Sequence, residues 1–191
     1  MEYSKPVSKR VHPHKFQMWI AMASIIMAFS GLISAYLVKM NQDNWLQFDL
    51  PSIFTVSTIV ILLSSATMYL SLKKFKEREL PQYRICITIT ALLGILFITL
   101  QVIGFFTTDH LGVKLVGKGA NASGSFLLVI AGLHILHVLG GVIALLVQFF
   151  KAFSGRSRNY SSVPIEVTAL YWHFVDILWI VIFVFLLVAK P

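Results

Sequence analysis

The last long apolar stretch of the chain reads EVTALYWHFVDILWIVIFVFLLV and runs from residue 166 to residue 188. Its only ionisable side chains are Glu166, His173 and Asp176. A helix needs about 20 predominantly apolar residues to cross the hydrocarbon core of a bilayer. This stretch therefore predicts a transmembrane helix.

Four more runs of the same kind precede it, at residues 16–38, 52–72, 85–106 and 125–150. All 16 lysines and arginines lie outside the five runs. The predicted fold class is all-α: a polytopic membrane helical bundle with five transmembrane helices. We expect residues 1–15 to form a basic tail and residues 16–191 to form a single membrane domain.

The composition excludes several classes of protein. Hydrophobic residues make up 57% of the chain and charged residues 13%, whereas soluble domains average about 45–50% and 25%. A soluble enzyme and a nucleic-acid-binding protein are therefore excluded. Cys86 is the only cysteine, so the chain has neither an internal disulfide nor a two-thiolate copper site.

The net charge of +8 indicates an orientation in the membrane. Twelve lysines and arginines fall in the N-terminal tail and in the loops 73–84 and 151–165, and four fall on the other side. Because short cytoplasmic loops are enriched in Lys and Arg, we expect a cytoplasmic N-terminus and an external, periplasmic C-terminus.

Ionisable side chains inside the predicted spans are concentrated in the last two. Such groups are costly in lipid and are candidates for function. At about 1.5 Å per residue, His134 and His137 lie roughly 13 and 18 Å into span four, and His173 and Asp176 roughly 10 and 15 Å into span five. Each pair is spaced i, i+3 and shares a helix face, which predicts a polar cluster between the two spans.

Three roles for this cluster remain open from the residues alone. The histidines could ligate a haem, the His and Asp groups could form a proton relay, or a hydrogen-bonded cluster could fix the packing of the helices. The structural role is the preferred interpretation. On the first two readings the chain would be a free-standing membrane cytochrome or a proton-coupled transporter.

Small residues predict close helix packing in two spans. Such residues on one face let a neighbouring backbone approach closely in lipid. Whether the neighbour belongs to this chain or to another subunit stays open. The predicted packing residues are Ser24, Ala28, Gly31 and Ala35 in span one, and Gly132, Gly140 and Gly141 in span four.

Two motifs resemble subunit III of the haem–copper terminal oxidases, in its five-helix form. The sequence from Tyr171 through Trp172, His173 and Asp176 to Trp179 is similar to the last helix of that family, with Glu166 as the preceding acidic residue. The pattern G-x-H-x-x-H-V-x-G from Gly132 to Gly140, with His134 and His137, resembles its penultimate helix. Weaker matches are Ser64-Ser65, Gln101 and the stretch 24–36.

The resemblance implies an accessory, non-catalytic subunit of a proton-pumping respiratory oxidase. It implies that this chain binds no haem or copper, that both lie in partner subunits, and that phospholipid is bound. The expected partners are the catalytic subunit I, the copper-bearing subunit II, membrane phospholipids and, in some organisms, a respiratory supercomplex. The expected location is the bacterial inner membrane. The expected electron donor is cytochrome c, with a quinol oxidase as the alternative.

Two positions depart from the family pattern. Many relatives have a glutamate where this chain has Ile25, and some have a glutamate where it has Gly104. Both differences argue against a direct proton-carrying role and favour the structural interpretation of the polar residues.

Overall fold

The computed structural model describes residues 13–42, 45–154 and 161–189, and these contain five helices and no strand. The helices are α1 (Pro13–Lys39), α2 (Ser52–Lys76), α3 (Leu80–His110), α4 (Ala122–Phe153) and α5 (Val163–Ala189). All five are long and apolar enough to cross a membrane. The prediction of a five-helix membrane bundle is confirmed.

Each helix contains its predicted span and extends beyond it. The helix α3 begins five residues before the predicted run, with a proline in its first turn, where a missing N–H leaves no intrahelical bond unmade. The helix α1 begins at Pro13, so the last residues of the predicted tail are helical. The rest of that tail, residues 1–12, and the basic residues Arg156, Arg158 and Lys190 lie outside the described residues.

The connections have the chemistry of tight turns. Between α2 and α3, Arg78 takes a left-handed conformation with φ of 64°. Between α3 and α4, Gly112, Gly117 and Gly119 have φ of 88–93°, which a residue without a Cβ adopts at no steric cost.

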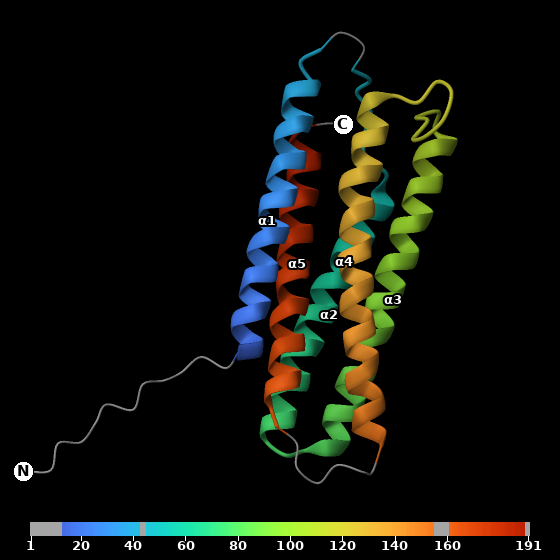
Figure 1. Cartoon of the computed structure of the whole chain (residues 1–191). Coiled ribbons are helices and arrows are strands. Elements are labelled where there is room, and N and C mark those ends of the chain that lie inside the picture. Colours follow the sequence, from blue (N-terminus) through green and yellow to red (C-terminus); the bar gives the residue numbers. More distant parts are fainter. Residues whose placement is uncertain (1–12, 43–44, 155–160, 190–191) are drawn as a thin grey trace, which may run out of the picture.

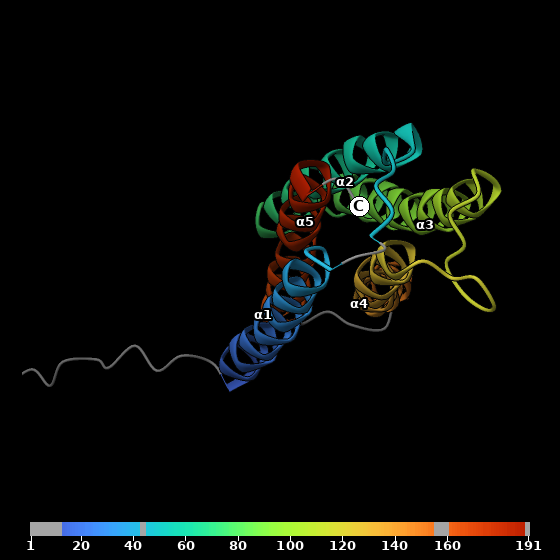
Figure 2. The ribbon, with the colours of Figure 1, turned by 90° about the horizontal axis from the view of Figure 1, so that it is seen from above.

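The helix α5 has the largest buried share of its apolar stretch among the five helices and runs alongside α1 (Figures 1 and 2). It contacts α1, α2 and α4, while α3 packs between α2 and α4. The helix α1 contacts α4 and α5 only, among the five helices. Of the most apolar window of each helix, 11% is buried in α1 and 44% in α5. The helix α1 is therefore peripheral.

The basic loops meet at one end of the bundle, which we call the basic end. Here α1, α3 and α5 begin and α2 and α4 end (Figure 1). The described lysines and arginines of this end include Lys15, Lys73, Lys74, Lys76, Arg84 and Lys151. This arrangement agrees with the predicted grouping of the basic segments on one side of the membrane.

Candidate functional site

The motif of the last span lies in the middle of α5, and several of its side chains are buried. Trp172 and Trp179 are among the largest fully buried side chains of the protein. They are spaced seven residues apart and so lie on one face of the helix, two turns from each other. This pair of tryptophans organises the contacts of α5 with its neighbours.

Trp172 fills a gap made by two glycines. A Cβ placed on Gly94 of α3 would lie 2.6 Å from the Trp172 ring, and one on Gly141 of α4 would lie 2.9 Å from it. The indole N–H donates to the hydroxyl of Ser64 on α2 at 3.1 Å. Through one side chain, α5 is therefore joined to three helices.

Trp179 repeats this arrangement two turns further along. Its N–H donates to the hydroxyl of Thr58 on α2 at 2.9 Å. Its ring packs against Phe97 of α3, with 5.4 Å between centroids, and against the imidazole of His134 of α4, with 5.1 Å. The tryptophan thus holds His134 within an aromatic layer.

The two α2 hydroxyls pass the hydrogen bonds on. Ser64 accepts from Trp172 and donates to the carbonyl of Thr90 on α3 at 3.3 Å. Thr58 accepts from Trp179 and donates to the carbonyl of Phe54 at 2.8 Å. Polar groups in lipid need such partners because no water is present there to form hydrogen bonds with them. These bonds give specific register to helices whose apolar surfaces give little.

The two histidines of α4 have different surroundings. His134 is fully buried between the rings of Phe29, Phe97 and Trp179, and neither ring nitrogen has a hydrogen-bond partner among the described residues. His137 is half-buried. Its Nδ1 lies 2.7 Å from the carbonyl oxygen of Leu133, one turn back on the same helix.

The two polar residues of α5 are turned elsewhere. His173 Nδ1 lies 2.7 Å from the hydroxyl of Ser65 on α2. Asp176 is 2% exposed, and its carboxylate lies near the hydroxyl of Ser65, the residue that His173 contacts, without meeting the geometry of a hydrogen bond. It lies one turn from Trp172 and from Trp179, on the face that carries both.

The prediction that these four groups satisfy one another across the last two spans is wrong. His173 bonds to α2 instead of α4, and the residue that reaches α4 is Tyr171, whose hydroxyl donates to the carbonyl of His137 at 3.0 Å. The faces of α5 are turned so that its aromatic rings, rather than its ionisable groups, meet α4. Among the described residues no group of three or more His, Cys, Asp or Glu side chains could hold a metal ion.

Glu166 has a different position, in the first turn of α5 at the basic end. Its carboxylate pairs with Lys15 of α1 and, at 3.2 Å, with Lys76 of α2. One side chain therefore joins three helices. Its side chain is 19% exposed, whereas those of Lys15 and Lys76 are 35% and 54% exposed, so both are surface ion pairs of modest strength.

The small residues divide into those that pack within the chain and those that do not. Gly141 lies against Trp172, as described above. A Cβ on Gly31 or Gly132 would meet nothing within 4 Å, and one on Gly140 would meet only the Tyr171 hydroxyl at 3.9 Å. Ser24, Ala28, Gly31 and Ala35 are all exposed, because α1 turns Phe29 and Tyr36 inward instead. The stripe of α1 makes no helix contact within the described chain.

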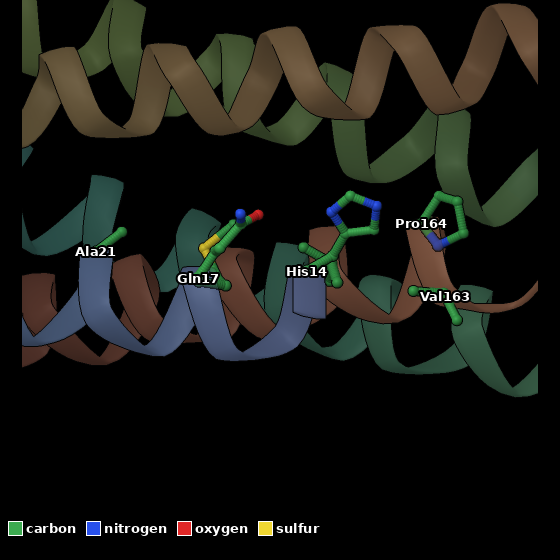
Figure 3. Close-up of a pocket in the computed structure, with 7 residues that line it drawn as sticks. His14, Gln17, Ala21, Val163 and Pro164 are labelled. Atoms are coloured by element: carbon green, nitrogen blue, oxygen red, sulfur yellow. The ribbon is translucent and has the colours of Figure 1, made fainter. Parts of the chain in front are cut away.

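A cavity of about 480 Å³ lies between the first turns of α1 and α5. Figure 3 shows the side chains of His14 and Pro164 beside this space, with Gln17 and Ala21 along α1 and Val163 on α5. Most of the residues that line the cavity are apolar, and the cavity is open to the surroundings. It lies next to the ion pair of Lys15 with Glu166.

Several residues of this site were not predicted from the sequence: Thr58, Gly94, Lys15 and Lys76. A usable signal was present in α2, where Ser57, Thr58, Ser64 and Ser71 are fully or almost fully buried and recur at helical spacing. A row of hydroxyls in an apolar helix indicates a face that accepts hydrogen bonds from a neighbour.

Comparison with known proteins matches this chain to the family that its motifs resemble. The family model described as cytochrome c oxidase subunit III matches residues 15–189. Cytochrome c oxidase subunit 3 of Bacillus sp. (strain PS3) is 28% identical over 170 residues, which are 86% of this chain and 80% of that protein.

Two relatives carry a different name. Cytochrome bo(3) ubiquinol oxidase subunit 3 of Buchnera aphidicola subsp. Baizongia pistaciae is 30% identical over 174 residues, covering 87% of each chain. Quinol oxidase subunit 3 of Bacillus spizizenii is 33% identical over 175 residues, which are 86% of this chain and 81% of that protein.

Proposed function

The chain belongs to the cytochrome c oxidase subunit III family, and from this premise we propose that it is the accessory third subunit of a proton-pumping haem–copper respiratory oxidase. In this role it stabilises the catalytic subunit I and the lipid around it, beside the copper-bearing subunit II. It takes part in oxygen reduction as a component of the complex and carries no step of the reaction itself.

The observation that carries this proposal is the use of the α5 motif within the chain. Trp172, Trp179 and Tyr171 each donate a hydrogen bond to a neighbouring helix, and their rings fill gaps in the bundle. Side chains committed to packing support a scaffold role.

The proposed electron donor is cytochrome c. The second candidate is a quinol oxidase of the same family, in which a quinol is the donor. Sequence identity does not separate the two candidates. Relatives named as quinol oxidase subunits reach 30% and 33% identity, and relatives named as cytochrome c oxidase subunits reach 28% and 33%. The donor binds to other subunits, so residues of this chain do not discriminate between the two.

We place the chain in the bacterial inner membrane, with the basic end at the cytoplasmic side. The grouping of Lys15, Lys73, Lys74, Lys76 and Lys151 at one end supports this orientation, since short loops rich in Lys and Arg remain in the cytoplasm.

The test is affinity purification of the full-length tagged chain from its native membrane in a mild detergent. We expect co-purification of a haem-bearing partner, recognised by its visible spectrum and by copper analysis, with oxygen consumption supported by reduced cytochrome c. Oxygen consumption with quinol alone would favour the second candidate. The chain expressed alone should give no stoichiometric pyridine-haemochrome signal. Recovery of the chain without any haem-bearing partner, under conditions where the respiratory oxidases remain intact, would contradict the proposal.

A further inference from the structure

A second groove lies at the basic end, on the outer surface of the α3–α4 pair. It has a volume of about 420 Å³ and is lined by Pro81, Arg84, Ile85, Thr88 and Ile89 of α3 and by Phe153 in the last turn of α4. This volume falls within the range of about 300–1,000 Å³ that is usual for sites of small ligands. Its single charged group is Arg84.

The Arg84 side chain is held in place by two contacts. Its Nε donates to the carbonyl of Ala152 at 2.8 Å, and its guanidinium carbon lies 5.2 Å from the centre of the Phe153 ring. Both contacts fix the plane of the guanidinium, and among the described residues neither contact uses its terminal N–H groups, which can bond to another acceptor. A guanidinium held in this way is arranged for two-point binding of a phosphate.

No acidic side chain of the described residues pairs with Arg84, although the basic end contains three glutamates. Glu77 pairs with Lys73 and Lys74, Glu79 pairs with Lys74, and Glu166 pairs with Lys15 and Lys76. The described carboxylates of this end are therefore engaged by lysines. The charge of Arg84 is complementary to an anion from outside the chain.

The groove changes character along α3. Arg84 immediately precedes the apolar run, and Ile85 and Ile89 continue the groove toward the middle of the membrane. The hydroxyl of Thr88 donates to the carbonyl of Arg84 at 2.7 Å, so its hydrogen is used within the helix. The groove thus offers one cationic group at the level of the headgroups and an apolar surface below it.

We propose that this groove binds an anionic phospholipid, with the phosphate on the terminal nitrogens of Arg84 and an acyl chain along Ile85 and Ile89. An apolar partner helix does not satisfy the charge of Arg84, whereas a phospholipid satisfies both parts of the groove. The proposal rests on the lipid role within the proposed function and adds the site and the headgroup charge to it.

The experiment uses the full-length chain, delipidated in a neutral detergent and titrated with phosphatidylglycerol or phosphatidylcholine while bound lipid is counted by native mass spectrometry. Arg84→Gln removes the charge, and Ile85→Trp fills the groove without changing the charge. The matched controls are Lys73→Gln, a charge removed at the same end on α2, and Ile103→Trp, an exposed isoleucine far along the same helix.

We expect the wild type to bind phosphatidylglycerol more tightly than phosphatidylcholine. Arg84→Gln should weaken the binding of phosphatidylglycerol roughly tenfold, which corresponds to one lost charged hydrogen bond. It should also abolish the preference for phosphatidylglycerol over phosphatidylcholine. Ile85→Trp should weaken the binding of both lipids, and both control variants should bind the two lipids as the wild type does. Thermal unfolding of every variant provides the check that it is folded, and Ile85→Trp keeps the test decisive if Arg84→Gln unfolds.

Equal affinity of wild type and both groove variants for phosphatidylglycerol overturns the proposal. So does a cross-link in the assembled oxidase that joins position 89 to a helix of a partner subunit, because the groove would then be covered by protein. Co-purification of the haem-bearing partner is scored separately in the same variants. Failure of the lipid site is thereby distinguishable from failure of the proposed oxidase membership.

Discussion

At the scale of single residues, Gly94 is the glycine at which an added Cβ would come closest to another side chain. A Cβ there would lie 2.6 Å from Trp172 and 3.0 Å from Val142. Overpacking of a filled core costs typically about 1–3 kcal/mol. We therefore expect Gly94→Ala to lower the free energy of unfolding of the chain in detergent by this amount, measured by chemical or thermal unfolding.

The control is the same substitution at Gly31, where a Cβ meets nothing within 4 Å. Alanine is the better helix former there. The Gly31→Ala chain should be as stable as the wild type or slightly more so. Equal losses at the two positions would show that the gap around Trp172 is not the reason for the glycine.

The bond between Trp179 and Thr58 can be measured by a double-mutant cycle. Trp179→Phe removes the N–H donor, and Thr58→Val removes the acceptor with little change in shape. Because the two side chains bond at 2.9 Å, we expect a coupling free energy of about 0.5–1.5 kcal/mol between the substitutions, in the range found for hydrogen bonds within membranes.

Pairing Thr58→Val with Trp19→Phe provides the comparison, since Trp19 is 48% exposed on α1, which does not contact α2. That coupling should be near zero. A coupling near zero for Trp179 as well would be inconsistent with the bond.

The residues of the motif could be selected from the sequence, but their partners could not. Ionisable and aromatic side chains stand out in an apolar helix. The rotation of the helix about its own axis cannot be predicted in the same way, because α5 is apolar on every side and no polar face marks the outside. The predicted His/Asp pairing assumed one rotation, and the ring of Trp179 against His134 shows another.

At the scale of helices, apolar length was a sufficient guide to number and order. The ends were less predictable, because a helix continues past the hydrocarbon boundary into turns that carry Lys, Arg and Gln. The helix α3 extends from Leu80 to His110, well beyond the predicted 85–106. Length in lipid sets the span, and prolines at or just before the first turn mark where α2 and α3 begin.

Glu166 is expected to control how α1 is attached. Glu166→Gln removes the ion pairs to Lys15 of α1 and Lys76 of α2. We expect faster hydrogen exchange in the first turns of α1 and little change in α3 and α4. The global loss of stability should stay below about 1 kcal/mol, because both lysines are partly exposed.

Glu77→Gln is the matched control, since Glu77 directly follows α2 and, among the described residues, pairs with Lys73 and Lys74 of that helix. Exchange in α1 should be unaffected by it. If the two substitutions loosened α1 equally, the loss of a negative charge at this end, and not the link between helices, would be the cause.

At the scale of the whole molecule, the orientation can be tested with single cysteines in a Cys86→Ser background. Lys114→Cys lies in the α3–α4 connection, and Glu77→Cys lies at the basic end. A membrane-impermeant maleimide applied to intact spheroplasts should label position 114 and should reach position 77 only after permeabilisation. The reverse pattern would show that the basic end is external.

The contacts of α1 have a consequence for biogenesis. Its neighbours are α4 and α5, which are the last helices to leave the ribosome, and it has no contact with α2 or α3. The first of the five helices to be made therefore stands alone in the bilayer until α4 and α5 follow. An apolar helix bonds its own backbone groups and is stable by itself in lipid, so we expect α1 to insert independently and the later helices to dock onto it.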